Sequence, residues 1–337
     1  RGIFSVDQHN ESAFLHELIE LLATTKFDVL IPVGYPVTHY VAKHAADIYR
    51  YVKFLSPDPA SEAIANDKYE IQRLAEKVSV PSPRTFLAQS QDDINDNSLK
   101  LGFPIIIKGR NESGQGIVAT AHNIDELRSH FQKLITKFSL TQETYPILQE
   151  FVPGWGCGFF AMYDEGKCKR EFMHRRIREY PPTGGVSCCA KSFYDARLSE
   201  YGKKLLDALH WHGVAMVEFR FDRRINDYRL IEINAKFWGS LDLALAAGAD
   251  FPGDYVKIAS GQAVEFSNRY KNITYQWLLS GDLMYGLRRP LKMPSIIFTA
   301  VNPFVRKDFL RLDDPFVLFM KIIKLLREIV YSIFRRK

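Results

Sequence analysis

Residues 214–240 constrain the fold more than any other stretch, because they combine two strand patterns with three oxygen-bearing side chains. The first strand carries Glu218, a turn rich in Asp and Asn follows, and the second strand carries Glu232 and Asn234. Side chains alternate across a strand, so Glu232 and Asn234 share a face, and antiparallel pairing would place Glu218 beside them. The stretch therefore predicts a β-hairpin with three oxygen ligands on one face.

Oxygen ligands gathered in this way repel one another unless a cation joins them. A hard divalent ion such as Mg²⁺ accepts them and keeps waters or phosphates in its other positions. The alternative interpretation is a solvated polar face on an edge hairpin. The hairpin alone does not separate the two interpretations.

Length and charge set outer limits on the architecture. A chain of 337 residues is long enough for two or three units with separate cores. Its net charge of +6 is concentrated at one end, since residues 303–337 hold nine Lys or Arg and four Asp or Glu. The rest of the chain is close to neutral, so we expect no nucleic-acid partner.

The cysteines show no C-x-x-C spacing, which argues against a zinc site or a redox pair; they are Cys157, Cys168, Cys188 and Cys189. There is neither a signal-peptide pattern nor a run of eighteen apolar residues. We therefore expect a reducing, cytoplasmic setting. The chain begins at Arg1 without a methionine, which suggests a trimmed product.

The first 65 residues alternate between helix and strand patterns. A buried strand is expected over 27–34, a helix through about residue 46, and a short strand at 51–55. Such alternation predicts a parallel α/β layer, but the piece is too short for a whole doubly wound domain. We expect a partial Rossmann-like layer whose first strand and helix are missing or replaced.

A glycine-rich segment lies between two further strand patterns. A strand ends at Lys108, the loop 109–116 holds three glycines, and a returning strand follows. Such a loop can fold its amide groups over phosphate oxygens, although a glycine-rich hairpin is more often a simple turn. Lys108 strengthens the phosphate interpretation as a fixed positive charge. Lys68 also supports the phosphate interpretation. It follows the expected N-cap Asp67 and so lies in the first turn of a helix, where a cation opposes the helix dipole unless an anion is bound.

The order of these features resembles the ATP-grasp superfamily over about residues 66–262. The motifs that carry the resemblance are Asp67-Lys68, Ile107-Lys108-Gly109, Gln149-Glu-Phe-Val-Pro-Gly154, Arg178-Glu-Tyr-Pro-Pro-Thr-Gly-Gly185, Val217-Glu-Phe219 and Glu232-Ile-Asn-Ala-Lys-Phe-Trp-Gly-Ser240. They are most similar to those of uncharacterised carboxylate–amine ligases that look like the large subunit of carbamoyl-phosphate synthase. The resemblance implies an α/β (α+β ATP-grasp) fold in which two lobes clamp a nucleotide.

This resemblance divides the chain into three parts. Residues 1–65 form the incomplete pre-ATP-grasp layer, and residues 66–265 form the ATP-grasp domain, with lobes of about 66–150 and 151–265. Residues 266–337 form a C-terminal extension.

The resemblance also implies which residues bind ATP and metal. Lys68 and Lys108 correspond to the lysines that hold the α- and β-phosphates. The loop that closes over the β- and γ-phosphates corresponds to Gly109, Ser113, Gly114 and Gly116. Adenine would contact Glu150 and Val152 of the strand that comprises Gln149, Glu150, Phe151 and Val152. One or two Mg²⁺ ions, with Mn²⁺ as an alternative, would be held by Glu218, Glu232 and Asn234.

By the same resemblance, ATP phosphorylates a carboxylate, and an amine then displaces phosphate from the acyl phosphate. This chemistry needs cations around the transferred group, and the candidates are Arg176, Arg178, Lys236 and, ranked lower, Arg220. Arg220 is included because it lies two residues beyond Glu218. The alternative for Arg176, Arg178 and Lys236 is that they are ordinary surface bases.

Two departures from the family pattern keep other functions open. Many relatives have Arg where this chain has Lys236, and residues 153–158 offer no carboxylate for the ribose hydroxyls. The alternative function is a nucleotide-binding module with a regulatory or scaffolding role and no turnover. A third is a kinase or carboxylase-like enzyme that uses the same acyl-phosphate chemistry.

Residues 316–337 predict an amphipathic helix with Lys and Arg on one face and apolar residues on the other. The helix either packs on the body or a partner, or lies on an anionic membrane surface as a peripheral contact. Its charges every three or four residues argue against a spanning helix.

Overall fold

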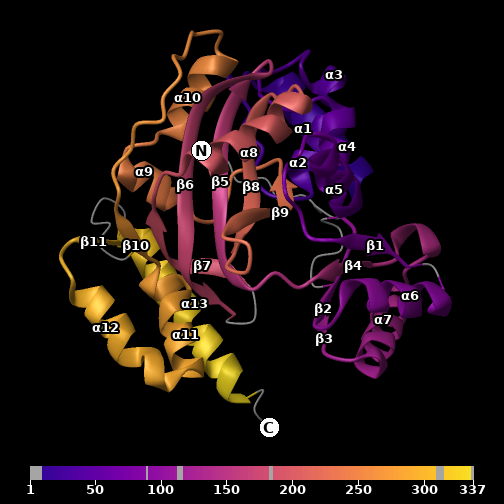
Figure 1. Cartoon of the computed structure of the whole chain (residues 1–337). Helices are drawn as coiled ribbons and strands as arrows, with labels where there is room; N and C mark the ends of the chain where they lie inside the picture. Colours follow the sequence, from indigo (N-terminus) through magenta and orange to yellow (C-terminus); the bar gives the residue numbers. More distant parts are fainter. Residues whose placement is uncertain (1–9, 89, 112–116, 182–184, 309–314, 335–337) are drawn as a thin grey trace.

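The computed structural model describes residues 10–88, 90–111, 117–181, 185–308 and 315–334. Within these ranges the chain forms a helical N-terminal region, a small antiparallel sheet, a larger mixed sheet and a group of C-terminal helices. Figure 1 shows the small sheet and its helices standing beside one end of the large sheet. The two lobes are each built of helices and sheet, as the sequence predicts.

The N-terminal region is mostly helical. Its helices are α1 (Glu11–Thr24), α2 (Val37–Lys43), α3 (Ala45–Ile48) and α4 (Pro59–Asn66). The strands expected over 27–34 and 51–55 are reduced to one parallel bridge between Val29 and Lys53. The pairing direction is therefore the expected one, but neither run pairs with a further segment of the described chain. A small core holds the region together and consists of Leu22, Val41, Ile48, Val52 and Phe54.

The small sheet is antiparallel and has the strand order β1-β4-β2-β3. Its strands are β1 (Thr85–Leu87), β2 (Ile105–Lys108), β3 (Val118–Ala121) and β4 (Ile147–Glu150). Helices α6 (Gln91–Leu101) and α7 (Ile124–Phe138) cover one face, and a short 3-10 turn spans Gln142–Thr144. Because β2 alternates buried and half-buried residues, Ile105 and Ile107 enter this core while Ile106 and Lys108 face the other way.

The large sheet has the strand order β11-β10-β7-β6-β5-β8-β9 and is antiparallel except where β10 meets β11. Its strands are β5 (Gly154–Asp164), β6 (Lys167–Tyr180), β7 (Val186–Ser192), β8 (Gly213–Asp222), β9 (Asp227–Asn234), β10 (Thr274–Gln276) and β11 (Val305–Lys307). The predicted hairpin is β8–β9, in which Glu218 lies directly opposite Glu232. Its turn contains Asn226 in the left-handed region, which Asn tolerates.

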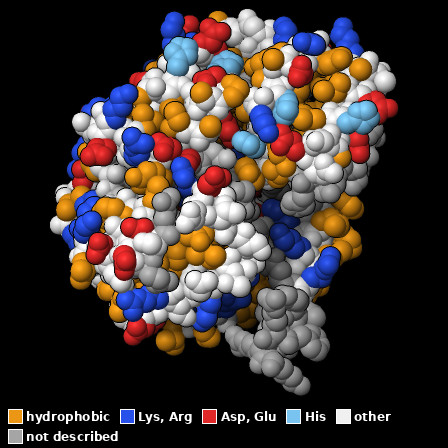
Figure 2. Space-filling view, turned by 90° about the vertical axis from the view of Figure 1, so that its right-hand side faces the viewer, with side chains coloured by type: hydrophobic (Ala, Val, Ile, Leu, Met, Phe, Trp, Pro, Cys, Tyr) orange, Lys and Arg blue, Asp and Glu red, His pale blue; other side chains and the backbone are white. Residues whose placement is uncertain are grey.

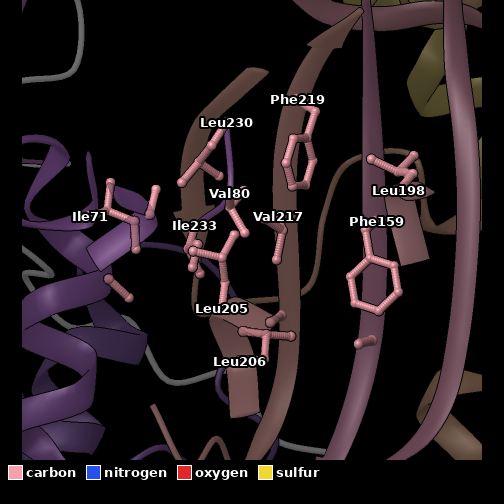
Figure 3. Packing of buried hydrophobic residues seen from close by; sticks show 14 of the residues in the cluster. Ile71, Val80, Phe159, Leu198, Leu205, Leu206, Val217, Phe219, Leu230 and Ile233 are labelled. Carbon is pink, nitrogen blue, oxygen red and sulfur yellow. The ribbon is translucent and has the colours of Figure 1, made fainter. Parts of the chain in front are cut away.

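Both faces of the large sheet are packed. Helices α5 (Lys68–Lys77) and α8 (Ala196–Ala208) cover one face, while α9 (Leu241–Ala247) and α10 (Phe251–Ala259) cover the other. Figure 3 shows Leu205 and Leu206 of α8 beside Val217 and Ile233 of the hairpin. Full burial of such a side chain contributes about 1.5–3 kcal/mol, so this core fixes the hairpin firmly.

The cysteines and the most buried histidine belong to the framework. Cys188 and Cys189 are buried in β7, and all four cysteines are free thiols. His174 of β6 is buried, and its Nε2 lies 2.7 Å from the hydroxyl of Ser240. Burial lowers the pKa of His174 to about 3, so the ring is neutral in the folded protein.

The C-terminal region begins with a π-helical turn at Leu278–Asp282 and continues with α11 (Leu283–Arg288), a 3-10 turn at Pro290–Lys292, α12 (Met293–Val301) and α13 (Pro315–Phe334). Helix α13 packs on the body through the buried Leu325, and Lys321 lies 3.5 Å from Asp308. One face of this helix therefore contacts protein. Among the described helices, none is both long enough and apolar enough to cross a membrane.

Candidate active site

A cavity of about 590 Å³ lies between the two sheets. The small sheet contributes Ile106, Lys108, Thr120 and Gln149, and the large sheet contributes Arg176, Glu179, Ser187, Met216, Glu218, Arg220, Ile231, Glu232 and Asn234. Further walls come from Lys68 at the start of α5, from the connection at Phe151 and Val152, and from the segment 236–240. Its volume is that of a typical small-molecule site. On the face shown in Figure 2, acidic and basic side chains are interspersed.

Helix α5 places Lys68 at one end of the cavity. Asp67 caps the helix as predicted, because its carboxylate accepts from the backbone N–H groups of Tyr69 and Glu70. Asp67 also accepts from Arg110 Nε at 2.7 Å, and the Lys68 N–H donates to the Arg110 carbonyl at 2.7 Å. The start of α5 is thus tied to the segment that follows Lys108.

The hairpin carboxylate Glu232 is surrounded by polar partners. Lys68 Nζ lies 3.4 Å from Glu232 Oε2, and the Asn234 side chain donates to Glu232 Oε1 at 3.1 Å. Burial alone would raise the pKa of Glu232, but the positive charges of Lys68 and Lys108 outweigh it and lower that pKa. Burial lowers the pKa of Lys108, against the opposing effect of Glu232. The two lysines and Glu232 thus form one electrostatic unit.

The second carboxylate, Glu218, is paired with Arg176, whose Nη2 donates to Glu218 Oε2 at 2.7 Å. Arg176 comes from β6, so its side chain must cross β5 to reach β8. Gly156 of β5 makes room, since a Cβ there would lie 3.1 Å from Arg176 Cδ and 3.0 Å from Glu179 Oε1. Burial raises the pKa of Glu218, Arg176 opposes this, and the charge of Glu232 adds to it.

The donor set at this end of the cavity fits a hard divalent cation. Glu218 and Glu232 are direct cross-strand partners that line the same cavity, and Asn234 supplies an amide oxygen two residues along β9. Within the part of the chain that the structure describes, no group of three or more His, Cys, Asp or Glu side chains could hold a metal. Two carboxylates and one amide do not fill the coordination sphere of Mg²⁺. They would leave coordination positions for water or phosphate, as in Mg²⁺ sites that also bind phosphate.

The other end of the cavity is built by the connection between the sheets. Phe151 and Val152 line it, and Arg220 donates to the carbonyl oxygens of Val152 at 3.0 Å and Gly154 at 2.8 Å. The guanidinium of Arg220 thereby fastens β8 to this connection. The Gln149 side chain donates to Thr85 at 3.0 Å and is buried.

The carboxylate of Glu150 is occupied by protein partners. It lies 3.1 Å from Arg84 Nε and 3.0 Å from Arg224 Nη2. Burial alone would raise the pKa of Glu150, but the hydrogen bonds from Arg84 lower it. Glu150 lines the cavity, yet its charge serves to join the two sheets.

Comparison with known proteins shows which folds and sequences this chain resembles. Over 208 residues the chain is 26% identical to the carbamoyl phosphate synthase large chain of Methanosphaerula palustris, covering 59% of this chain and 19% of that protein. The biotin carboxylase domain of 2-oxoglutarate carboxylase from Hydrogenobacter thermophilus, solved with MgADP and bicarbonate, superposes with a TM-score of 0.66 at 14% identity, covering 77% of this chain and 60% of that one. The L-amino acid ligase of Bacillus licheniformis superposes with a TM-score of 0.62 at 16% identity, covering 79% and 65%.

The chain has the ATP-grasp fold. No model of a known protein family matches it. The chain spans about a fifth of the length of the carbamoyl phosphate synthase large chains to which it is similar, and the structural likenesses show the fold.

The sequence-based placement of one ATP-grasp candidate needs correction. Arg178 does not line the cavity; it is buried and donates to both carboxylate oxygens of Asp282 at 2.7 Å. The cause is an irregularity in β6, where the register against β7 shifts on both sides of Arg178. A bulge breaks the alternation of side chains, so Arg178 turns away while Glu179 enters the cavity.

The remaining ATP-grasp candidates divide into two groups. The structure brings Lys68, Lys108, Gly109, Glu218, Glu232, Asn234, Arg176, Arg220, Lys236 and the segment 149–152 to one cavity. Ser113, Gly114 and Gly116 lie outside the described residues. Sequence reasoning missed Glu179, Gly156 and the pairing of Arg110 with Asp67. The glycines of β5 were visible in the sequence, but their purpose depends on the strand order.

Proposed function

We propose that this chain binds ATP with Mg²⁺ between its two sheets and acts as an ADP-forming ligase that joins a carboxylate to an amine. The observation that carries the proposal is the meeting of Lys68 and Lys108 with Glu218 and Glu232 in one cavity. Two ammonium groups opposite two carboxylates suit a triphosphate whose charge is shared with a metal ion. The similarity to carbamoyl phosphate synthase and to an L-amino acid ligase favours C–N bond formation.

In this proposal the phosphates lie against Lys68 and Lys108, and the loop from Gly109 through Ser113, Gly114 and Gly116 closes over them. The adenine ring lies between apolar walls. These walls are formed by Ile106, Phe151, Val152, Met216 and Ile231. Gln149 and Glu150 shape this end of the cavity, with Glu150 acting through Arg84 and Arg224.

Glu218, Glu232 and Asn234 would hold one or two Mg²⁺ ions, or Mn²⁺ in their place. The ion would neutralise charge that builds up between the phosphates during transfer. The residues themselves prepare the site, because Lys68 and Lys108 lower the pKa of Glu232, and Arg176 opposes the rise that burial causes in the pKa of Glu218.

The reaction has two balanced steps. A carboxylate oxygen of the first substrate attacks the γ-phosphorus, the bond to ADP breaks, and an acyl phosphate forms. The amine nitrogen of the second substrate then attacks the acyl carbon, phosphate leaves with the C–O bonding pair, and the nitrogen loses a proton. Arg176 and Lys236 supply positive charge beside the transferred group. Arg220 positions the connection at Val152 and Gly154 rather than the substrates.

The test is ATP-dependent phosphate release across a panel of carboxylic acids and amines. Release is expected with the matching pair and should disappear in Glu232→Gln. The matched control is Glu200→Gln, which changes an exposed carboxylate on α8. Equal release by wild type and Glu232→Gln would refute the metal role of Glu232. Mass spectrometry of the product distinguishes an amide from a phosphorylated or carboxylated acid.

A regulatory or scaffolding module is the second candidate, favoured by Lys236 in place of the arginine of many relatives. It predicts that the protein binds ATP without turnover across the whole panel. Contact of α13 with a lipid surface is a separate proposal, because the helix lies apart from the residues that line the cavity.

A further inference from the structure

Exposed apolar side chains are concentrated in the C-terminal region. Of the 28 large apolar side chains that are exposed in the described part of the chain, twelve lie between Leu287 and Leu326. They come from α11, the 3-10 turn at Pro290–Lys292, α12, the turn after α12 and α13, elements that occupy one corner of the molecule in Figure 1. Monomeric soluble proteins rarely expose contiguous apolar area on this scale unless it binds something.

Helix α12 and the turn that follows it are the strongest part of this surface. The helix has no charged residue, and among its nine residues only Ile296 is buried. Phe298 and Val301 are each 71% exposed, and Phe304 in the turn is 87% exposed. Packing within the described part of the chain leaves these aromatic and aliphatic side chains exposed.

Positive charge surrounds the same elements. Residues 283–337 hold twelve Lys or Arg and four Asp or Glu, a formal charge of +8, whereas the whole chain carries +6. Arg288 ends α11, Arg289 and Lys292 lie between α11 and α12, and all three are exposed, as is Arg306 of β11. None of these four forms an ion pair with a described acid. The apolar side chains are thus flanked by four cations that pair with no acid in the described part of the chain.

Helix α13 adds to the surface although one face of it packs on the body. Leu325 is buried and Lys321 contacts Asp308, so these positions hold the helix in place. Phe316, Phe319 and Leu326 are exposed. A helix that is fixed along one side and apolar on another can rest in the interface of a bilayer without crossing it.

We propose that α12, the turn at Phe304 and α13 together form a docking surface for a membrane that contains anionic lipids. The apolar side chains enter the boundary between headgroups and acyl chains, and the arginines and lysines meet the lipid phosphates. A second copy of the chain fits this surface less well. A symmetric dimer brings the same patch of both subunits together, which would oppose two regions of charge +8. The proposal is independent of the ligase reaction.

The test is flotation of the full chain with vesicles. Vesicles of phosphatidylcholine with about one third phosphatidylglycerol are compared with vesicles of phosphatidylcholine alone, at low and high salt, since salt screens headgroup attraction. We expect binding to the anionic vesicles that weakens in high salt. The double substitution Phe298→Ser with Phe304→Ser should lower the partition coefficient at least about tenfold, because it removes two inserting rings.

Matched controls separate surface chemistry from general effects. Leu99→Ser removes an apolar side chain that is 85% exposed on α6, and it should leave vesicle binding unchanged. Arg288→Glu with Lys292→Glu should abolish the preference for anionic vesicles, whereas Lys26→Glu with Lys133→Glu, at exposed positions elsewhere, should not. These point substitutions are preferable to deletion of 316–337, which would remove the buried Leu325.

Three results would overturn the proposal. The first is that the wild type does not float with anionic vesicles. The second is that Leu99→Ser and the Phe298/Phe304 variant lose vesicle binding equally. The third is that the wild type binds no vesicles but forms a dimer in sedimentation velocity, and that the Phe298/Phe304 substitutions dissociate this dimer. Flotation of the wild type that depends on both the aromatic and the basic positions supports it.

Discussion

Glu218 and Glu232 face each other across β8 and β9, and each carboxylate has a cation of its own, Arg176 at 2.7 Å and Lys68 at 3.4 Å. Like charges directly opposite in a sheet are destabilising unless compensated. The two cations come from opposite directions, one from the neighbouring strands and one from the start of α5. The pair is therefore held in place by contacts that span the large sheet and α5.

The glycine at position 156 is expected to matter through Arg176. Gly156→Ala places a methyl group 3.1 Å from Arg176 Cδ and 3.0 Å from Glu179 Oε1, so both side chains must shift and the contact of Arg176 with Glu218 weakens. We expect a loss of about 1–3 kcal/mol in the free energy of unfolding, the usual effect of a buried polar group left unpaired. A double-mutant cycle with Arg176→Met checks the cause. If Gly156→Ala lowers the free energy of unfolding by the same amount in the Arg176→Met background as in wild type, the glycine has another role.

Arg178 and Asp282 should behave as a structural pair. Arg178→Met leaves Asp282 buried without its charged partner, so we expect a loss of about 3–5 kcal/mol in denaturant unfolding. The double substitution Arg178→Met with Asp282→Leu removes both charges and should recover most of that stability. Once stability is recovered, phosphate release should recover with it. A stable double variant without turnover would instead support a catalytic role for Arg178.

The sequence predicts the hairpin and its facing carboxylates because strand alternation and turn chemistry act locally. It predicts the cap at Asp67 for the same reason. It fails at Arg178, since a bulge depends on how β6 pairs with β7. It also fails for the carboxylate of Glu150, whose partners lie 66 and 74 residues away in the chain. Contacts of that separation follow from the tertiary fold, and no local pattern records them.

Asp67 has two separable functions, a cap for α5 and a partner for Arg110. Asp67→Asn retains a capping oxygen but loses the negative charge, so stability should change little while ATP binding weakens, because Lys68 is less firmly placed. Asp67→Ala should also lose about 1 kcal/mol of stability. Denaturant unfolding and calorimetric titration with ATP measure the two effects. Unchanged ATP affinity in both variants would separate Asp67 from the site.

Lys108 is expected to act on the phosphates alone. Lys108→Met should weaken binding of MgATP by about tenfold to a hundredfold, as expected for a charge-assisted contact of about 1.5–3 kcal/mol, and leave adenosine binding nearly unchanged. Isothermal titration with both ligands gives the comparison. Lys133→Met on α7 is the matched control, because it removes an exposed lysine of the same lobe. Parallel weakening of both ligands would place Lys108 outside the phosphate region.

His174 should give the folded protein a measurable sensitivity to acid. Its pKa falls from an ordinary value of 6.5 to about 3 because the ring is buried, and Arg176 further disfavours its charged form. Between pH 6.5 and pH 3 this histidine is therefore protonated in the unfolded chain but neutral in the folded chain. The contribution of His174 to the free energy of unfolding is complete above pH 6.5 and is lost as the pH falls towards 3. From this residue alone we expect a loss of about 2 kcal/mol between pH 7 and pH 5. Denaturant unfolding of wild type and His174→Gln at both pH values isolates the contribution, since the other acids titrate in both proteins. Equal losses in the two proteins would mean that His174 does not resist protonation in the fold.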